Sequence, residues 1–72
     1  MSKELPIKSK FLIFELDSDN CVHIFNRRFN DLIAVINPQR HFIPEKNTLW
    51  SERDLKDISR CIEYLKKMGK TI

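Results

Sequence analysis

Two cysteines and two histidines are the residues of this chain whose chemistry could serve a site. Cys21 and His23 stand two positions apart, so on a strand their side chains would share one face. His41 and Cys61 would complete a set of two cysteines and two histidines, but the four residues do not form the close pairs of zinc motifs. We therefore expect both cysteines to be small buried apolar residues, and we predict no metal site and no cofactor.

A cysteine beside a histidine could also act as a nucleophile with its base. Such a pair needs a third group to orient it, an oxyanion site and a pocket. The chain has 72 residues and a single glycine, so few loops are available to build these parts. We predict that the protein is not an enzyme and that it has no catalytic residues.

The basic residues could bind phosphate groups. The chain has 13 Lys and Arg against 10 Asp and Glu, and the net charge of +3 permits a polyanionic partner without requiring one. Phe25 and Phe29 lie among the basic residues, and cations combined with aromatic rings are typical of nucleic-acid binding. In this nucleic-acid hypothesis the sheet and the basic turns bind, and the residues are Lys8, Lys10, Arg27, Arg28, Arg40 and His41. In the alternative, these are ordinary charged turns and the two rings pack in the core.

Composition describes one small folded domain. Apolar residues make up 42% of the chain and charged residues 32%, a balance typical of folded soluble proteins. No run approaches the roughly 18 apolar residues of a membrane span, and the polar N-terminus lacks the apolar core of a signal peptide. Two cysteines are too few for a disulfide scaffold. We expect a cytoplasmic protein without a membrane partner.

Two apolar segments, 10–17 and 21–26, flank a turn signal at 17–20 and predict a β-hairpin. A two- or four-residue loop would place even positions of the first strand beside odd positions of the second. One face would then carry Leu12, Phe14, Leu16, Cys21, His23 and Phe25, and the other Phe11, Ile13, Glu15, Val22, Ile24 and Asn26. Both faces of this hairpin would be largely apolar.

The segment between the hairpin and the helix predicts one or two further strands. The β-branched segment 32–37 predicts a third strand. A type I turn over 37–40 and a short fourth strand at 41–43, which Pro44 ends, are expected to follow. Residues 1–9 are polar, and we expect them to form an arm outside a single domain that spans residues 10–72.

The last third predicts one helix over residues 52–68, followed by Gly69. Ser51 is the expected N-cap, with Trp50 and Leu55 as a hydrophobic staple. One apolar stripe has helical spacing: Leu55, Ile58, Cys61, Ile62, Leu65 and Met68. The predicted fold class is α+β, a small antiparallel sheet of three to four strands with this amphipathic helix packed on one face, in the order β-β-β-(β)-α.

One helix covers one face of a sheet, so the second apolar face has no predicted helical cover. The arm residues Leu5 and Ile7 could cover it, or it could bind another protein or a second copy of the chain. Taking the second possibility, we predict a small non-enzymatic protein-interaction module of the regulator or inhibitor type. It would be a homodimer in the simplest case, binding through the sheet face or edge. Its predicted binding residues are Phe11, Ile13, Val22, Ile24, Arg27 and Arg28.

Overall fold

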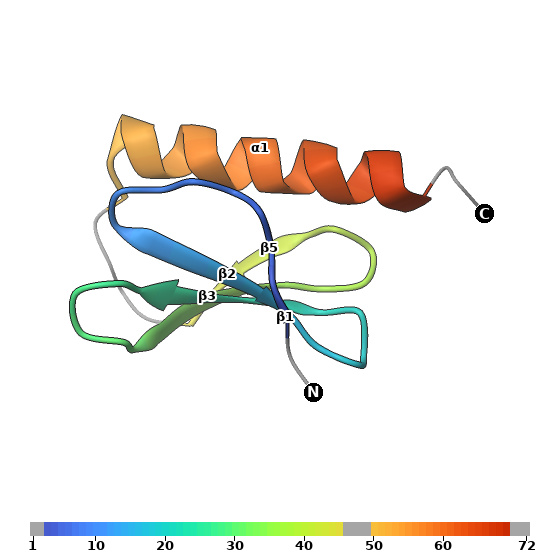
Figure 1. Cartoon of the computed structure of the whole chain (residues 1–72), viewed down its shortest axis with the longest axis horizontal. Coiled ribbons are helices and arrows are strands. Elements are labelled where there is room, and N and C mark those ends of the chain that lie inside the picture. Colours follow the sequence, from blue (N-terminus) through green and yellow to red (C-terminus); the bar gives the residue numbers. More distant parts are fainter. Residues whose placement is uncertain (1–2, 46–49, 70–72) are drawn as a thin grey trace.

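The computed structural model describes residues 3–45 and 50–69, which form a five-stranded antiparallel sheet followed by one helix (Figure 1). Each strand pairs with its neighbours along the chain, in the order β1-β2-β3-β4-β5. The elements are β1 (Lys3–Glu4), β2 (Leu12–Leu16), β3 (Val22–Asn26), β4 (Leu32–Ile36), β5 (Phe42–Pro44) and α1 (Glu52–Gly69). The predicted α+β class with a single C-terminal helix is confirmed, with five strands in place of three or four.

The additional strand comes from the segment predicted as an arm. Residues Lys3–Glu4 pair with the end of β2, and the backbone N–H of Leu5 donates to the carbonyl oxygen of Phe14 at 2.8 Å. Leu5 is only 4% exposed and belongs to the core, and Ile7 packs against that core. Both side chains therefore pack on the helix side of the sheet and do not cover its second face.

The hairpin of β2 and β3 has a three-residue loop, because Asn20 adopts a left-handed conformation with φ of 65°. The Asp17 carboxylate supports this turn by accepting the backbone N–H groups of Asp19 at 2.8 Å and Cys21 at 3.0 Å. In the resulting register Phe14 lies opposite Ile24, so even positions share a face. The predicted face assignment was therefore wrong, since it assumed a loop with an even number of residues.

Strand β4 carries an irregularity that increases its contribution to the core. Ile24 lies opposite Ala34 while Phe25 lies opposite Leu32, so Ile33 is an extra residue in β4. Both Ile33 and Ala34 are buried, although neighbouring residues of a regular strand point to opposite faces.

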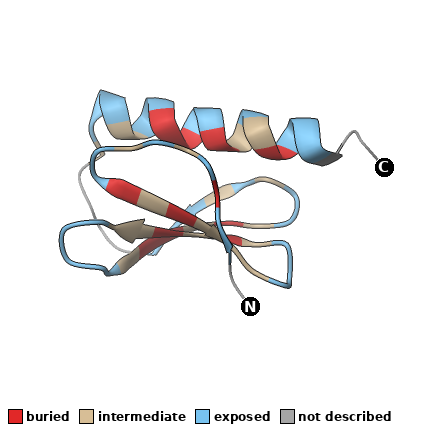
Figure 2. Cartoon of the chain, in the orientation of Figure 1, coloured by how far each residue is buried: buried red, intermediate tan, exposed pale blue. Residues whose placement is uncertain are grey.

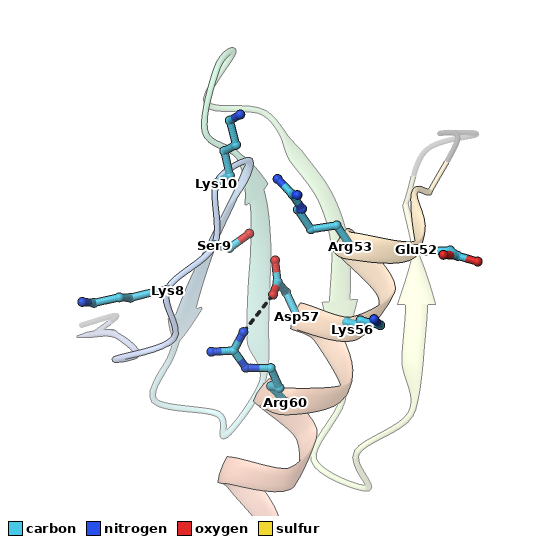
Figure 3. A pocket seen from close by; sticks show the side chains of 8 residues that line it. All are labelled: Lys8, Ser9, Lys10, Glu52, Arg53, Lys56, Asp57 and Arg60. Atoms are coloured by element: carbon cyan, nitrogen blue, oxygen red, sulfur yellow. Dashed lines mark hydrogen bonds and ion pairs between the residues drawn. The ribbon is translucent and has the colours of Figure 1, made fainter.

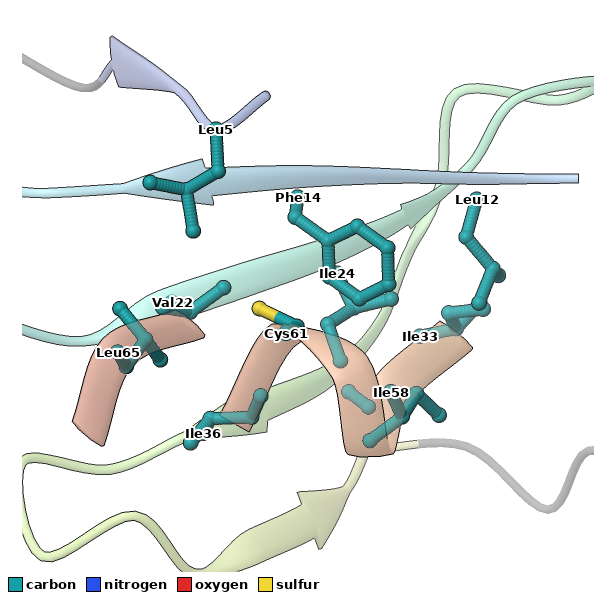
Figure 4. Close-up of a cluster of buried hydrophobic side chains, with 11 residues drawn as sticks. Leu5, Leu12, Phe14, Val22, Ile24, Ile33, Ile36, Ile58, Cys61 and Leu65 are labelled. Carbon is teal, nitrogen blue, oxygen red and sulfur yellow. The ribbon is translucent and has the colours of Figure 1, made fainter. Parts of the chain in front are cut away.

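Helix α1 packs across one face of the sheet, and the buried residues lie between these two layers (Figure 2). The Ser51 hydroxyl accepts the backbone N–H of Asp54 at 3.1 Å, which confirms the predicted N-cap. Trp50 packs edge-on against Phe42, with ring centroids 5.2 Å apart. The core cluster is Leu5, Leu12, Phe14, Val22, Ile24, Ile33, Ala34, Ile36, Ile58, Cys61 and Leu65 (Figure 4).

The buried stripe of α1 is narrower than predicted. Ile58, Cys61 and Leu65 are buried, whereas Leu55 and Met68 are 46% and 44% exposed. At about 100° per residue, Leu55 lies about 120° around the helix from Cys61, which turns it away from the sheet. The expectation that Leu55 lies on the buried stripe was therefore wrong.

Candidate interaction surfaces

The sheet face turned away from α1, the open face, is covered by no element of the described residues (Figure 1). In one row of its side chains, Ile13 lies opposite Phe25 and Phe25 opposite Leu32. The second row is Glu15, His23, Val35 and Ile43. Most of these side chains are partly buried by one another, and Ile43 is 44% exposed. Over strands β2–β5 the open face is therefore a largely apolar surface with two polar residues, and Glu4 of β1 lies beside Glu15 at its edge.

The two edges of the sheet are short. Strand β1 has two residues and β5 has three, of which the last, Pro44, has no backbone N–H. Short edge strands and edge prolines discourage the addition of a further strand. Of the two predicted modes of binding, face or edge, the open face therefore offers the larger surface.

Asp17 at the β2–β3 turn and Arg40 at the β4–β5 turn each have side-chain hydrogen-bond partners. His23 Nε2 lies 2.5 Å from Asp17 Oδ2. The N–H of Cys21, and next to it His23, hold the pKa of the Asp17 carboxyl below its ordinary value. The Arg40 guanidinium donates to the backbone and side-chain oxygens of Asn20, at 3.1 and 3.2 Å. We call this the paired end of the sheet.

At the other end, the β3–β4 turn lies against the start of β2. The backbone N–H of Arg27 donates to the carbonyl oxygen of Phe11 at 2.8 Å, and its guanidinium donates to Leu12 at 3.2 Å. Phe11 and Phe29 are 46% and 66% exposed, so the alternative that placed Phe29 in the core was wrong. Together with Arg28 and Trp50, the two phenyl rings line a cavity of about 230 Å³.

Next to this cavity, a larger basic cleft of about 620 Å³ separates residues 8–10 from α1 (Figure 3). Its lining residues are Lys8, Ser9, Lys10, Glu52, Arg53, Lys56, Asp57 and Arg60. Asp57 is only 5% exposed, and Arg60 Nη1 lies 3.3 Å from its Oδ1. Nothing in the spacing of the helix cations indicates that residues 8–10 cross beside them, so this cleft could not be found from the sequence.

The structure separates the six residues of the nucleic-acid hypothesis. Lys8 and Lys10 line the basic cleft, and Arg27 and Arg28 lie in the nearby β3–β4 turn. Arg40 and His41 lie at the paired end, about 17 Å away along a five-residue strand. A single site formed by all six residues is therefore not present.

The six residues predicted to bind a protein partner are also divided. Ile13 lies on the open face, whereas Phe11, Arg27 and Arg28 lie around the β3–β4 turn. Val22 and Ile24 have no exposed surface, and their prediction as surface residues was wrong because the hairpin register turns them toward α1. The apolar residues that share the open face with Ile13 are instead Phe25, Leu32, Val35 and Ile43.

The two cysteines and two histidines that were considered for a metal site or a nucleophile do not lie together. Cys21 is partly buried, and Cys61 is fully buried in the core, where burial raises the pKa of its thiol to about 12. His23 is held by Asp17, and His41 lies exposed in the β4–β5 turn. Within residues 3–45 and 50–69, no three His, Cys, Asp or Glu residues are grouped so that they could hold a metal ion.

No protein-family model, curated protein or solved structure matches this chain. In the part of the chain that the structure describes, no helix has the length and apolar character needed to cross a membrane. A function must therefore be argued from the surfaces themselves.

Proposed function

We propose that this chain is a small non-enzymatic protein-interaction module of the regulator or inhibitor type, and that it binds through the open face. The observation that carries the proposal is an apolar sheet face that α1 and the N-terminal segment leave uncovered. A sheet with one face on the core usually alternates apolar and polar residues along its strands. Here Ile13, Phe25 and Val35 occupy outward positions where polar residues would be expected.

The partner that we propose is a second copy of the chain. Two sheets bury their faces by packing about 10 Å apart, and a two-fold axis lets one patch serve both subunits. A domain of this size buries only roughly 60% of its unfolded surface, so a second layer on the sheet adds stability that the monomer lacks. We also infer a cytoplasmic location, since Cys21 and Cys61 are both free thiols.

The size of the open face sets the expected affinity. Strands β2–β5 make a surface about 17 Å long and about 19 Å wide, or roughly 300 Å². A standard protein interface buries about 800 Å² on each partner. The proposed dimer therefore belongs to the weak class, and self-association is expected at micromolar or higher concentrations.

Sedimentation velocity over a concentration series tests this proposal. Ile43→Lys places a charge on the open face, whereas Leu55→Lys places the same charge on the outer side of α1. The two side chains are almost equally exposed, at 44% and 46%, so their effects on folding should be similar. We expect the original chain and Leu55→Lys to associate and Ile43→Lys to stay monomeric.

A monomer at all concentrations up to the millimolar range would overturn the proposal of a second copy. Equal loss of association in both variants would also contradict it, because the interface would then not be specific to the open face.

A further inference from the structure

A second surface lies where residues 8–11, the β3–β4 turn and the start of α1 meet, at the opposite end from the paired turns. Its principal residues are Lys10, Phe11, Arg28, Phe29, Arg53 and Lys56, and we call it the basic–aromatic end. We propose that it binds single-stranded nucleic acid, with the cations on phosphates and the phenyl rings stacked on bases. This site has no residue in common with the open face and does not depend on the proposed dimer.

The charge of the chain is concentrated in the basic cleft. Five of its lining residues are basic and two are acidic, so the cleft has a net charge of +3, equal to that of the whole chain. Arg60 neutralises Asp57, and Figure 3 shows that Glu52 points away from residues 8–10 and that Lys8 points away from α1. Among the described residues, Arg53 and Lys56 have no anionic partner. Such a surface attracts an external polyanion.

The exposed rings show what kind of polyanion fits. Phe29 is 66% exposed and Phe11 46% exposed, and both border the cavity of about 230 Å³ beside the basic cleft. Lys10 Nζ lies 5.4 Å from the centroid of Phe11, and the Arg28 guanidinium lies 5.5 Å from that of Phe29. Each ring thus has a cation over one of its faces, so a phosphate contact lies next to a ring on which a base is proposed to stack.

A single strand fits these features better than the other polyanions. Duplex bases are stacked and paired, so their flat sides are not available to Phe11 and Phe29. An acidic protein segment would satisfy Arg53 and Lys56, but it would not require two exposed rings beside the cations. In a single strand every base has a flat side, so sequence-independent binding is expected.

Fluorescence anisotropy with a labelled mixed-sequence single strand of about ten nucleotides tests the proposal. For three or four phosphate contacts, the logarithm of the association constant should fall with the logarithm of the salt concentration with a slope of roughly −2 to −3. Arg53→Ala should weaken binding and make the slope less steep by roughly 0.7, since one phosphate contact is lost. Lys66→Ala, at the far end of the same helix, is the control and should leave both quantities unchanged.

The rings are tested separately from the charges. Phe29→Ala should weaken binding roughly 5- to 150-fold through lost stacking while leaving the salt slope unchanged. Ile43→Ala removes an exposed apolar side chain on the open face and should not affect oligonucleotide binding. Thermal unfolding of each variant shows whether it is folded, and these exposed side chains are expected to leave the core intact.

Three results would overturn the proposal. The first is no binding at low salt, and the second is tighter binding to the matching duplex than to the single strand. The third is binding of polyglutamate that is as tight as oligonucleotide binding and is unchanged by Phe29→Ala. Measurements on Ile43→Lys keep the two proposals apart. A monomeric variant that still binds the strand supports the basic–aromatic end, whatever the state of the open face.

Discussion

The two faces of the sheet come from the same strands and differ in what covers them. Ile24 has no exposed surface because it points toward α1, whereas the next residue, Phe25, points to the open face and is only partly buried. Ile36 and Val35 show the same contrast in β4. An apolar side chain therefore does not by itself indicate the core, since the register of one hairpin decides which face α1 covers.

The covered face accounts for most of the stability. Burial of an aliphatic or phenyl side chain contributes about 1.5–3 kcal/mol, and Phe14, Ile24 and Leu65 are almost completely buried there. On the open face the same residue types remain partly in water, so they contribute less to the stability of the monomer. Substitutions on the two faces should therefore differ strongly.

The largest expected difference is in the reactivity of the two cysteines. Cys61 lies in α1 and packs in the core against the covered face, and a pKa of about 12 leaves on the order of one thiol in ten thousand ionised at pH 8. Cys21 precedes Val22 on the strand and is partly exposed. Ellman's reagent should modify Cys21 alone in the folded protein and both thiols in guanidinium. Fast modification of both thiols without denaturant would contradict the buried position of Cys61.

A matched pair of isoleucines compares the two faces directly. Ile24→Ala should lower the free energy of unfolding by about 2–5 kcal/mol, and Ile43→Ala by less than about 1 kcal/mol. Urea unfolding measures both values. A chain of this length has a total stability of only about 4–11 kcal/mol, so Ile24→Val, expected to cost about 0.5–1.5 kcal/mol, is the substitute if Ile24→Ala does not fold. Equal losses at the two positions would mean that both faces are covered.

Loss of the helix cap should lower the free energy of unfolding by less than loss of a buried side chain on the covered face. Ser51→Ala removes the hydroxyl that accepts the N–H of Asp54, and it should lower the free energy of unfolding by about 1 kcal/mol. Ser59→Ala makes the same change at an exposed position within α1, where alanine favours the helix. Urea unfolding should show destabilisation in the first variant only, and a neutral Ser51→Ala would contradict the cap.

The smallest expected effect concerns the ion pair between Asp17 and His23. The pKa of Asp17 lies below its ordinary value of 3.8 in the folded chain, so the unfolded chain binds this proton more tightly. The stabilising contribution of the carboxylate is thus complete above that ordinary value and is lost as the pH falls through the lower folded value. Urea unfolding of Asp17→Asn and the original chain should differ near neutral pH and converge in acid. A difference that persists at acid pH would exclude titration of Asp17 as its cause.

The helix and the strand positions could be predicted because their signals are local. Ser51 and the spacing of Ile58, Cys61 and Leu65 lie within one segment, and each favours the same helix. The short apolar segment that includes Leu12, Ile13 and Phe14, with an adjoining turn, likewise predicts a hairpin. The extra strand β1 was missed because only two polar residues form it, and its partner in β2 is distant in the chain.

The proposed basic–aromatic end could not be predicted from local signals. Arg53 and Lys10 lie far apart in the sequence, and they border one cleft only because residues 8–10 run beside α1. The exposure of Phe29 depends on its place at the tip of the β3–β4 turn, which composition does not reveal. Grouping the basic residues by sequence therefore mixed Arg40, which Asn20 holds at the paired end, with residues of the other end.

The sequence by itself determined the fold class, the position of the helix and the apolar character of both sheet faces, since caps, periodicity and turn residues act over a few positions. Only the tertiary structure decided which face is the core. The left-handed conformation of Asn20 sets the loop length, the loop length sets the register, and a shift of one residue would exchange every side chain between the two faces. Which side chains share one surface depends on contacts between distant parts of the chain, so it follows from that register rather than from any local pattern.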